Sequence, residues 1–77
     1  MKARLIKNPE ITGSTEPFNI NSLSEVIMYF DDGSADSMFS SDIEVLVNSE
    51  WIPLDIAFKD GLVEISDDNT VFYERKQ

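Results

Sequence analysis

Residues 42–54 read Asp42-Ile43-Glu44-Val45-Leu46-Val47-Asn48-Ser49-Glu50-Trp51-Ile52-Pro53-Leu54. Two β-rich apolar runs are separated here by three polar residues that include Asn, a spacing typical of a β-hairpin. Pro53 has no amide hydrogen to donate, so we expect the second arm to lie at a sheet edge, or its nitrogen to point away from its neighbour. This stretch predicts a fold built mainly from short antiparallel strands.

The same rhythm of short apolar runs closed by polar turns extends along the chain. Strands are predicted over residues 3–7, 25–30 and, more weakly, 35–40. The run 25–30 has so few polar residues that we expect it to be central or covered on both faces. Residues 31–34 form a tight turn, because Asp bonds its own backbone and Gly33 tolerates positive φ.

Two further elements complete the pattern, and one long stretch lies outside it. Residues 55–60 are expected to form a single helical turn, capped by Asp55, with Ile56 and Phe58 facing inward and Gly61 ending it. Apolar and polar residues alternate along residues 62–65 and 70–74, which predicts a second hairpin. Residues 8–24 are polar and contain Gly and Pro, so a long loop is expected there.

A chain of 77 residues is expected to form a single domain, residues 1–77. Five to six short strands with one short helical turn predict a mostly β fold. The two favoured architectures are a small SH3-like barrel and a strongly bent antiparallel sheet. An OB-like barrel and an open α+β sheet remain alternatives.

The composition argues against several classes of function. The chain has neither cysteine nor histidine, so thiolate metal sites, disulfides and the usual general base are excluded. No stretch is apolar enough for a signal peptide or a membrane span. We therefore expect a cytoplasmic protein that binds no membrane, cofactor or metal and is not an enzyme.

The charge is unbalanced and segregated along the chain. Fifteen Asp and Glu residues face six Lys and Arg residues, giving a net charge of −9. Five of the six basic residues lie near the two ends, so the central region is strongly negative. Such a field repels nucleic acid and anionic lipid and attracts a basic protein partner. The alternative is that the excess of negative charge serves only to keep a small protein soluble.

Six residues are candidates for contact with such a partner, and five of them are carboxylates clustered within residues 31–44. We expect these five to form one continuous patch on the surface. The sixth is a tryptophan that follows a turn. Burial in the core is the favoured interpretation of this residue, and an exposed aromatic side chain there would instead anchor a partner. The six partner-binding candidates are Asp31, Asp32, Asp36, Asp42, Glu44 and Trp51.

The acidic segment after residue 30 also invites comparison with a calcium-binding loop. Counting Asp32 as the first ligand places Ile43 where the bidentate Glu is required and Ser37 where Gly is required. The calcium motif therefore fails, and a polar turn explains these residues.

Two resemblances add to this interpretation. Residues 28–35, continued by residues 42–46, resemble the strand, acidic turn and strand pattern of SH3-like and Tudor-like barrels. With its Met-Lys-Ala-Arg-Leu start and its Glu-Trp-Ile-Pro-Leu segment at residues 50–54, the chain is similar to small acidic bacteriophage and prophage accessory proteins. That second resemblance implies binding to a host enzyme and occupation of its nucleic-acid groove.

The leading hypothesis is a non-catalytic protein-binding module, for example a phage-type inhibitor that occupies the nucleic-acid-binding surface of a basic host protein. Alternate carboxylates on a strand lie about 6.8 Å apart, twice the roughly 3.4 Å axial spacing of phosphates along one DNA strand. An acidic sheet can thus pair with Lys and Arg that normally hold phosphate. The alternative is a small structural or assembly subunit that acts through self-association as a homo-oligomer.

Overall fold

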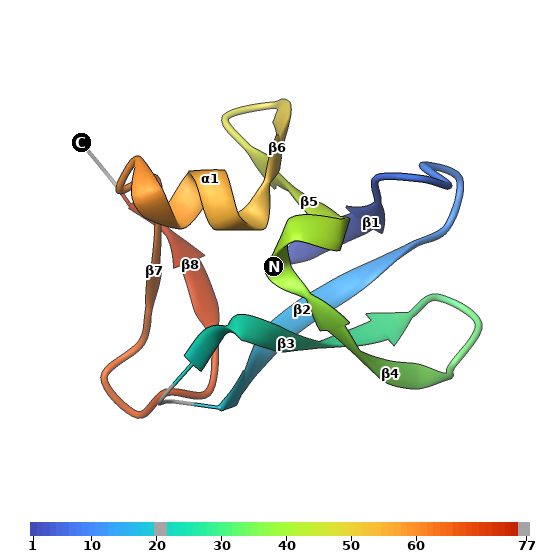
Figure 1. Cartoon of the computed structure of the whole chain (residues 1–77), viewed down its shortest axis with the longest axis horizontal. Helices are drawn as coiled ribbons and strands as arrows, with labels where there is room; N and C mark the ends of the chain where they lie inside the picture. Colours follow the sequence, from blue (N-terminus) through green and yellow to red (C-terminus); the bar gives the residue numbers. More distant parts are fainter. Residues whose placement is uncertain (20–21, 76–77) are drawn as a thin grey trace.

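The computed structural model describes residues 1–19 and 22–75, including all their side chains except those of Asn19, Ser22 and Leu23. The strands of this part are β1 (Lys2–Leu5), β2 (Thr12–Asn19), β3 (Ser22–Phe30), β4 (Ala35–Phe39), β5 (Ile43–Val47), β6 (Glu50–Pro53), β7 (Val63–Ile65) and β8 (Phe72–Glu74). A 3-10 helix, η1 (Ser40–Asp42), precedes β5, and an α-helix, α1 (Leu54–Lys59), follows β6 (Figure 1). The predicted mostly β fold is confirmed.

Six of these strands form one antiparallel sheet in the order β4-β3-β2-β1-β5-β6. β1 joins its two halves, because Ala3 lies opposite Gly13 of β2 on one side and Val45 of β5 on the other. β6 is an edge strand, as Pro53 predicts. β7 and β8 form a separate antiparallel pair, and α1 lies close to them in Figure 1.

The long loop expected over residues 8–24 is wrong for most of that range, because β2 and the start of β3 occupy it. Residues 20–21 of the range lie outside the described residues. The pairing of β2 with β3 buries Thr15, a polar side chain, and its Oγ1 donates a hydrogen bond to the Ile27 carbonyl oxygen at 2.8 Å. A polar residue with a partner of this kind can occupy a core position, so the strand carries no clear apolar alternation.

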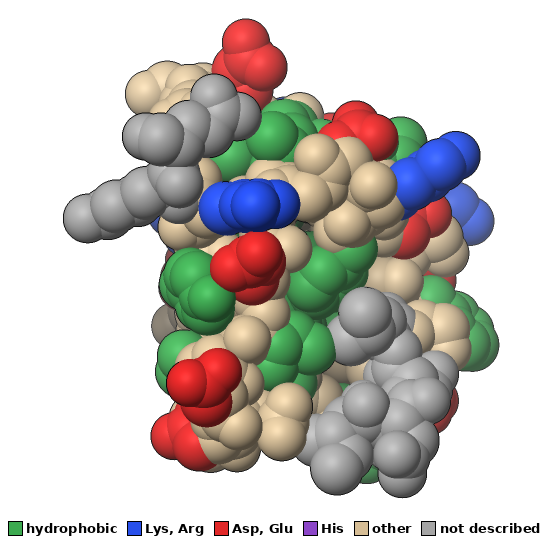
Figure 2. All heavy atoms as spheres, turned by 90° about the vertical axis from the view of Figure 1, so that its left-hand side faces the viewer, with side chains coloured by type: hydrophobic (Ala, Val, Ile, Leu, Met, Phe, Trp, Pro, Cys, Tyr) green, Lys and Arg blue, Asp and Glu red, His purple; other side chains and the backbone are tan. Residues whose placement is uncertain are grey.

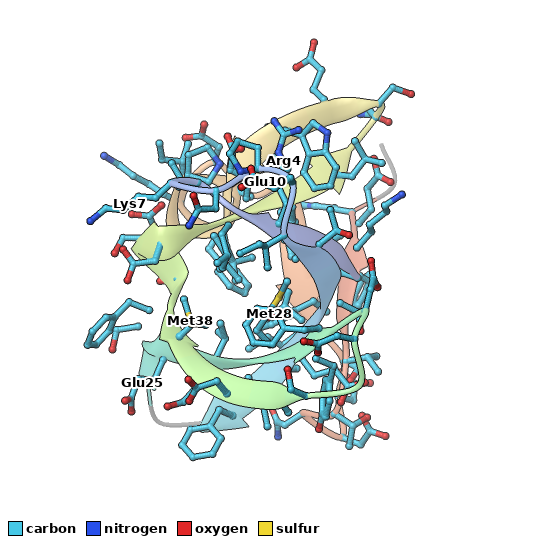
Figure 3. All side chains as sticks on the ribbon, turned by 90° about the vertical axis from the view of Figure 1, so that its right-hand side faces the viewer. Arg4, Lys7, Glu10, Glu25, Met28 and Met38 are labelled. Atoms are coloured by element: carbon cyan, nitrogen blue, oxygen red, sulfur yellow. The ribbon has the colours of Figure 1, made fainter. Side chains whose placement is uncertain are left out.

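The core lies between the inner face of the curved sheet and α1. Along β5, Ile43, Val45 and Val47 are buried while the residues between them are only half-buried. On β3, Val26 and Met28 are buried and Tyr29 is exposed. β3 therefore lies inside the sheet, as one of the two expectations had it, but only one of its faces is buried. Figure 3 shows Met28 and Met38 pointing into the space that the sheet encloses, and Lys7 and Glu25 pointing outward.

The predicted hairpin over residues 42–54 is confirmed as β5 and β6. Val47 lies opposite Glu50, and the two residues between them have φ values of 50° for Asn48 and 67° for Ser49. Positive φ at both central positions defines a type I′ turn, the turn whose twist suits a two-residue hairpin. The Asn48 backbone N–H also donates to the Glu74 carboxylate at 2.8 Å, which ties this turn to β8.

The helical turn forms with a different buried face from the one expected. α1 begins at Leu54, one residue earlier, and buries Leu54 and Ala57, three positions apart. Ile56 is 45% exposed, so its inward orientation was wrong, whereas Phe58 packs against the core, with its ring centroid 5.2 Å from that of Phe72. Asp55 was wrong as the cap, because its carboxylate accepts only the adjacent Ile56 N–H.

Gly61, at φ +72°, follows the end of α1, in agreement with the sequence. None of the helices within residues 1–19 and 22–75 has the length and apolar character needed to cross a membrane.

Candidate functional site

A hollow of about 430 Å³, here named the acidic hollow, opens between the β1–β2 connection and the β3–β4 turn. Both segments lie at the right-hand end of the molecule in Figure 1. Its lining combines apolar side chains with three acidic residues. The lining residues are Leu5, Glu10, Ile11, Thr12, Phe30, Asp31, Asp32 and Ser34.

Backbone hydrogen bonds hold the two walls of the acidic hollow in place. The Leu5 N–H donates to the Ile11 carbonyl oxygen at 3.1 Å, which folds the β1–β2 connection back on itself. The Asp31 N–H donates to the Thr12 carbonyl oxygen at 3.0 Å, and the Thr12 hydroxyl donates to the Asp31 carboxylate. Asp31 is therefore hydrogen-bonded to the opposite wall through both its backbone and its carboxylate.

The turn between β3 and β4 fixes the second carboxylate. Asp32 Oδ1 accepts hydrogen bonds from the Ser34 N–H at 2.8 Å and from Ser34 Oγ at 2.6 Å. The bond from the Ser34 hydroxyl, followed by that from the Ser34 N–H, lowers the pKa of Asp32 below its usual value. Gly33 supplies the positive φ, +94°, that this turn needs. Asp32 thus presents a charged and oriented carboxylate at neutral pH.

A lining of apolar and acidic residues suits one kind of side chain. Leu5 and Phe30 are half-buried, and Ile11 is 38% exposed. Lys and Arg carry an aliphatic stem that packs on apolar surface and a cationic head that carboxylates attract. The acidic hollow can therefore receive a Lys or Arg side chain from a partner.

Glu10 is the acidic lining residue that the sequence analysis missed. It lies in the β1–β2 connection, 21 positions from Asp31, within the segment expected to be a loop. No local pattern marks Glu10, because its place in the lining depends on the pairing of β2 with β1 and β3.

Asp42 lies in a neighbouring hollow of about 300 Å³. Leu5 belongs to the lining of both hollows, so the two adjoin. The second hollow carries one cation and one anion, Lys7 and Asp42, and the Ile6 N–H donates to the Asp42 carbonyl oxygen at 3.1 Å. Its charge is therefore mixed, unlike that of the acidic hollow.

Glu44 and Trp51 meet at a different place, around Arg4. Arg4 Nε lies 3.0 Å from Glu44 Oε1, and the Arg4 guanidinium carbon lies 4.2 Å from the centroid of the Trp51 ring. Trp51 is half-buried. Arg4 thus neutralises Glu44 and covers the Trp51 ring at the same time.

Asp36 is exposed on β4 and belongs to the lining of neither hollow. The five carboxylates expected to form one patch are therefore divided: Asp31 and Asp32 share the acidic hollow, and Asp36, Asp42 and Glu44 have other neighbours. On the face that carries α1, β7 and β8, acidic side chains lie among hydrophobic and neutral ones, and Lys and Arg side chains lie beside some of them (Figure 2). The acidic hollow brings Asp31 and Asp32 together with Glu10 in one lining.

Within residues 1–19 and 22–75, no group of three or more His, Cys, Asp or Glu side chains is arranged to hold a metal ion. Comparison with family models, curated proteins and solved structures found no match.

Proposed function

We propose that this protein is a non-catalytic protein-binding module whose acidic hollow receives a Lys or Arg side chain of a basic partner protein. The observation that carries the proposal is the gathering of Glu10, Asp31 and Asp32, with apolar side chains, in the lining of one hollow of about 430 Å³. Asp31 and Asp32 are already held by hydrogen bonds, so binding costs little further ordering of these groups.

Two finer features belong to the same proposal. The bent sheet, with β1 paired to both β2 and β5, is consistent with an SH3-like half-barrel. A partner that uses Lys and Arg to hold phosphate would lose those side chains to the acidic hollow, and the protein would then act as an inhibitor of nucleic-acid binding in the manner of small acidic phage proteins.

The test uses an acetylated, amidated Gly-Arg-Gly-Arg-Gly peptide, followed by ¹H–¹⁵N NMR at low salt. We expect amide shifts concentrated at residues 10–12 and 31–34. Glu10→Gln combined with Asp31→Asn should weaken binding about tenfold, and raising the salt concentration should also weaken it, because the contacts are charged.

The matched control is the pair Glu50→Gln and Asp67→Asn, two exposed carboxylates outside the lining of the acidic hollow. This pair removes the same charge and should leave the affinity nearly unchanged. Equal weakening by both pairs would show attraction to net charge alone, and shifts scattered over the molecule would reject the site.

Self-association is the second candidate, and one observation favours it. The large side chains of Phe18, Tyr29 and Phe39 are 57%, 42% and 56% exposed. Exposed apolar side chains of this kind occur at interfaces between copies of a chain. Sedimentation at micromolar concentration tests this alternative, which requires a mass above that of the monomer.

A further inference from the structure

β4 forms an open edge of the six-stranded sheet. It is the first strand in the sheet order, and within the described residues no strand pairs with its outer side. All of its residues except the half-buried Met38 are exposed. Such an edge offers unpaired backbone groups to an added strand.

The register identifies these backbone groups. The Phe30 N–H donates to the Ser34 carbonyl oxygen at 2.8 Å, so this pair is a hydrogen-bonded one. Antiparallel pairs alternate between bonded and non-bonded types, which makes Met28–Asp36 and Val26–Met38 the bonded pairs. The backbone groups that point away from β3 are those of Ala35, Ser37 and Phe39.

Asp36 partly closes this edge. Its Oδ1 accepts the Ser37 N–H at 2.8 Å, the central donor of the outward row. A strand added here must displace the carboxylate from Ser37, and an incoming Lys or Arg gives that carboxylate a new partner. The edge therefore favours a strand that brings a cation to Asp36.

The face of the sheet opposite to the Asp36 side chain is more apolar. Residues directly opposite in a ladder project to the same face, so Tyr29 and Ala35 share the outer face, as do Glu25 and Phe39. Tyr29 and Phe39 are exposed large apolar side chains of this face, and Asp36 projects to the other one. An added strand would meet apolar surface on its outer side and a carboxylate on its inner side.

We propose that the β4 edge binds an extended segment of a basic partner protein as an additional antiparallel or parallel strand in which apolar and basic side chains alternate. The apolar residues lie beside Ala35 and Phe39, with Tyr29 on the next strand, and a basic residue lies beside Asp36. This interface is separate from the acidic hollow, so either can be disproved while the other stands.

A second copy of the chain suits this edge less well. Pairing of β4 with its counterpart would bring two Asp36 carboxylates close together, between molecules that each carry a net charge of −9. Like charges opposite or diagonal in a ladder destabilise it. Charge complementarity thus selects a basic partner over another copy.

The test uses two acetylated and amidated peptides of identical composition, Val-Lys-Val-Lys-Val-Lys-Val and Val-Val-Lys-Lys-Lys-Val-Val. The alternating peptide should bind about tenfold more tightly, because only its pattern matches both faces of the edge. At saturation the amides of Ala35, Ser37 and Phe39 should exchange with solvent about tenfold more slowly. Equal binding of the two peptides, or no protection of these three amides, would overturn the proposal.

Two variants test the edge itself. Asp36→Asn keeps an oxygen that can accept the Ser37 N–H but removes the charge, and should weaken the alternating peptide about fivefold. Ser37→Pro removes the central donor without touching a β3 ladder bond, and should abolish its binding. Both should keep the ¹H–¹⁵N amide spectrum of the unchanged protein at residues outside β3 and β4, which shows that they are folded whether or not the acidic hollow binds the Arg peptide. Concentration-dependent protection of the same amides without peptide would instead assign the edge to a second copy.

Discussion

Arg4 and Glu44 lie directly opposite each other on β1 and β5, with Arg4 Nε 3.0 Å from Glu44 Oε1. Their side chains are 27% and 18% exposed, so water screens this pair less than an open surface pair. The Trp51 ring beneath the guanidinium adds a cation–π contact. Arg4 thus joins β1, β5 and β6 on the outer face of the sheet.

Replacing Arg4 by Met keeps most of the aliphatic stem and removes the charge. We expect the free energy of unfolding to fall by about 1–3 kcal/mol, because Glu44 loses a charged hydrogen bond and Trp51 loses its cation. Urea unfolding measures the change. The control is Lys2→Met on the same strand, an exposed position that should change stability little. A loss no larger for Arg4→Met than for Lys2→Met would contradict this role.

Gly13→Ala should be far more damaging than Gly33→Ala. A Cβ at Gly13 would lie 2.0 Å from the Tyr29 carbonyl oxygen and 2.9 Å from Phe30 Cα, both backbone atoms of the paired strand. A Cβ at Gly33 meets nothing within 4 Å, and only the φ of +94° opposes it. Thermal unfolding should show a loss of about 1–2 kcal/mol for Gly33→Ala and a clearly larger one, or no folded protein, for Gly13→Ala. Similar losses would mean that β2 and β3 are not in this close register.

Asp32 should titrate below the usual range for an Asp. Its folded-state pKa is lowered chiefly by the Ser34 hydroxyl and then by the Ser34 N–H. A lowered pKa stabilises the fold above the unfolded-state pKa, and this contribution is lost as the pH falls through the folded-state pKa. The Asp32 carboxyl carbon resonance, followed with pH, measures it. Ser34→Ala should raise the midpoint toward the usual value, and an unchanged midpoint would show that the hydroxyl bond is absent in solution.

Tyr73 should titrate above the usual range for a tyrosine. Its hydroxyl donates to Glu64 Oε2 at 2.8 Å, and this bond is the main reason why the pKa is raised. A raised pKa gives stability that is complete below the unfolded-state pKa and disappears as the pH rises through the folded-state pKa. Ultraviolet titration in a Tyr29→Phe background isolates Tyr73, since the chain has two tyrosines. Glu64→Gln should lower the midpoint, and a midpoint that does not move would exclude the bond.

Local sequence predicted the elements that local chemistry determines. The β5–β6 hairpin has its turn former, Asn48, between alternating runs, and Gly61 stands where the helix ends. β2 could not be recognised in this way, because its core residue is Thr15 and the acceptor that satisfies Thr15 is the Ile27 carbonyl, 12 positions away. The inward orientation of Ile56 was wrong because residues two positions apart, such as Ile56 and Phe58, point to different sides of a helix, whereas Leu54, Ala57 and Phe58 have the spacing of one face.

The residues of the candidate site also differ in whether local sequence could predict their position. Asp31 and Asp32 were predicted as an exposed acidic turn because they precede a glycine between two strands, and both line the acidic hollow. The position of Glu10 could not be predicted, because it depends on strand pairing and not on its neighbours in sequence. The same reason applies to Glu44, whose partner Arg4 is 40 positions away.

The bond between Glu74 and the Asn48 backbone has a consequence for the order of folding. β7 and β8 have three residues each, too few for a hairpin that is stable alone. Their inner residues, Val63 and Phe72, complete the packing around α1. During synthesis the chain can therefore reach its native state only after residue 74 has left the ribosome, and until then the partly formed sheet exposes surface that could aggregate or be degraded.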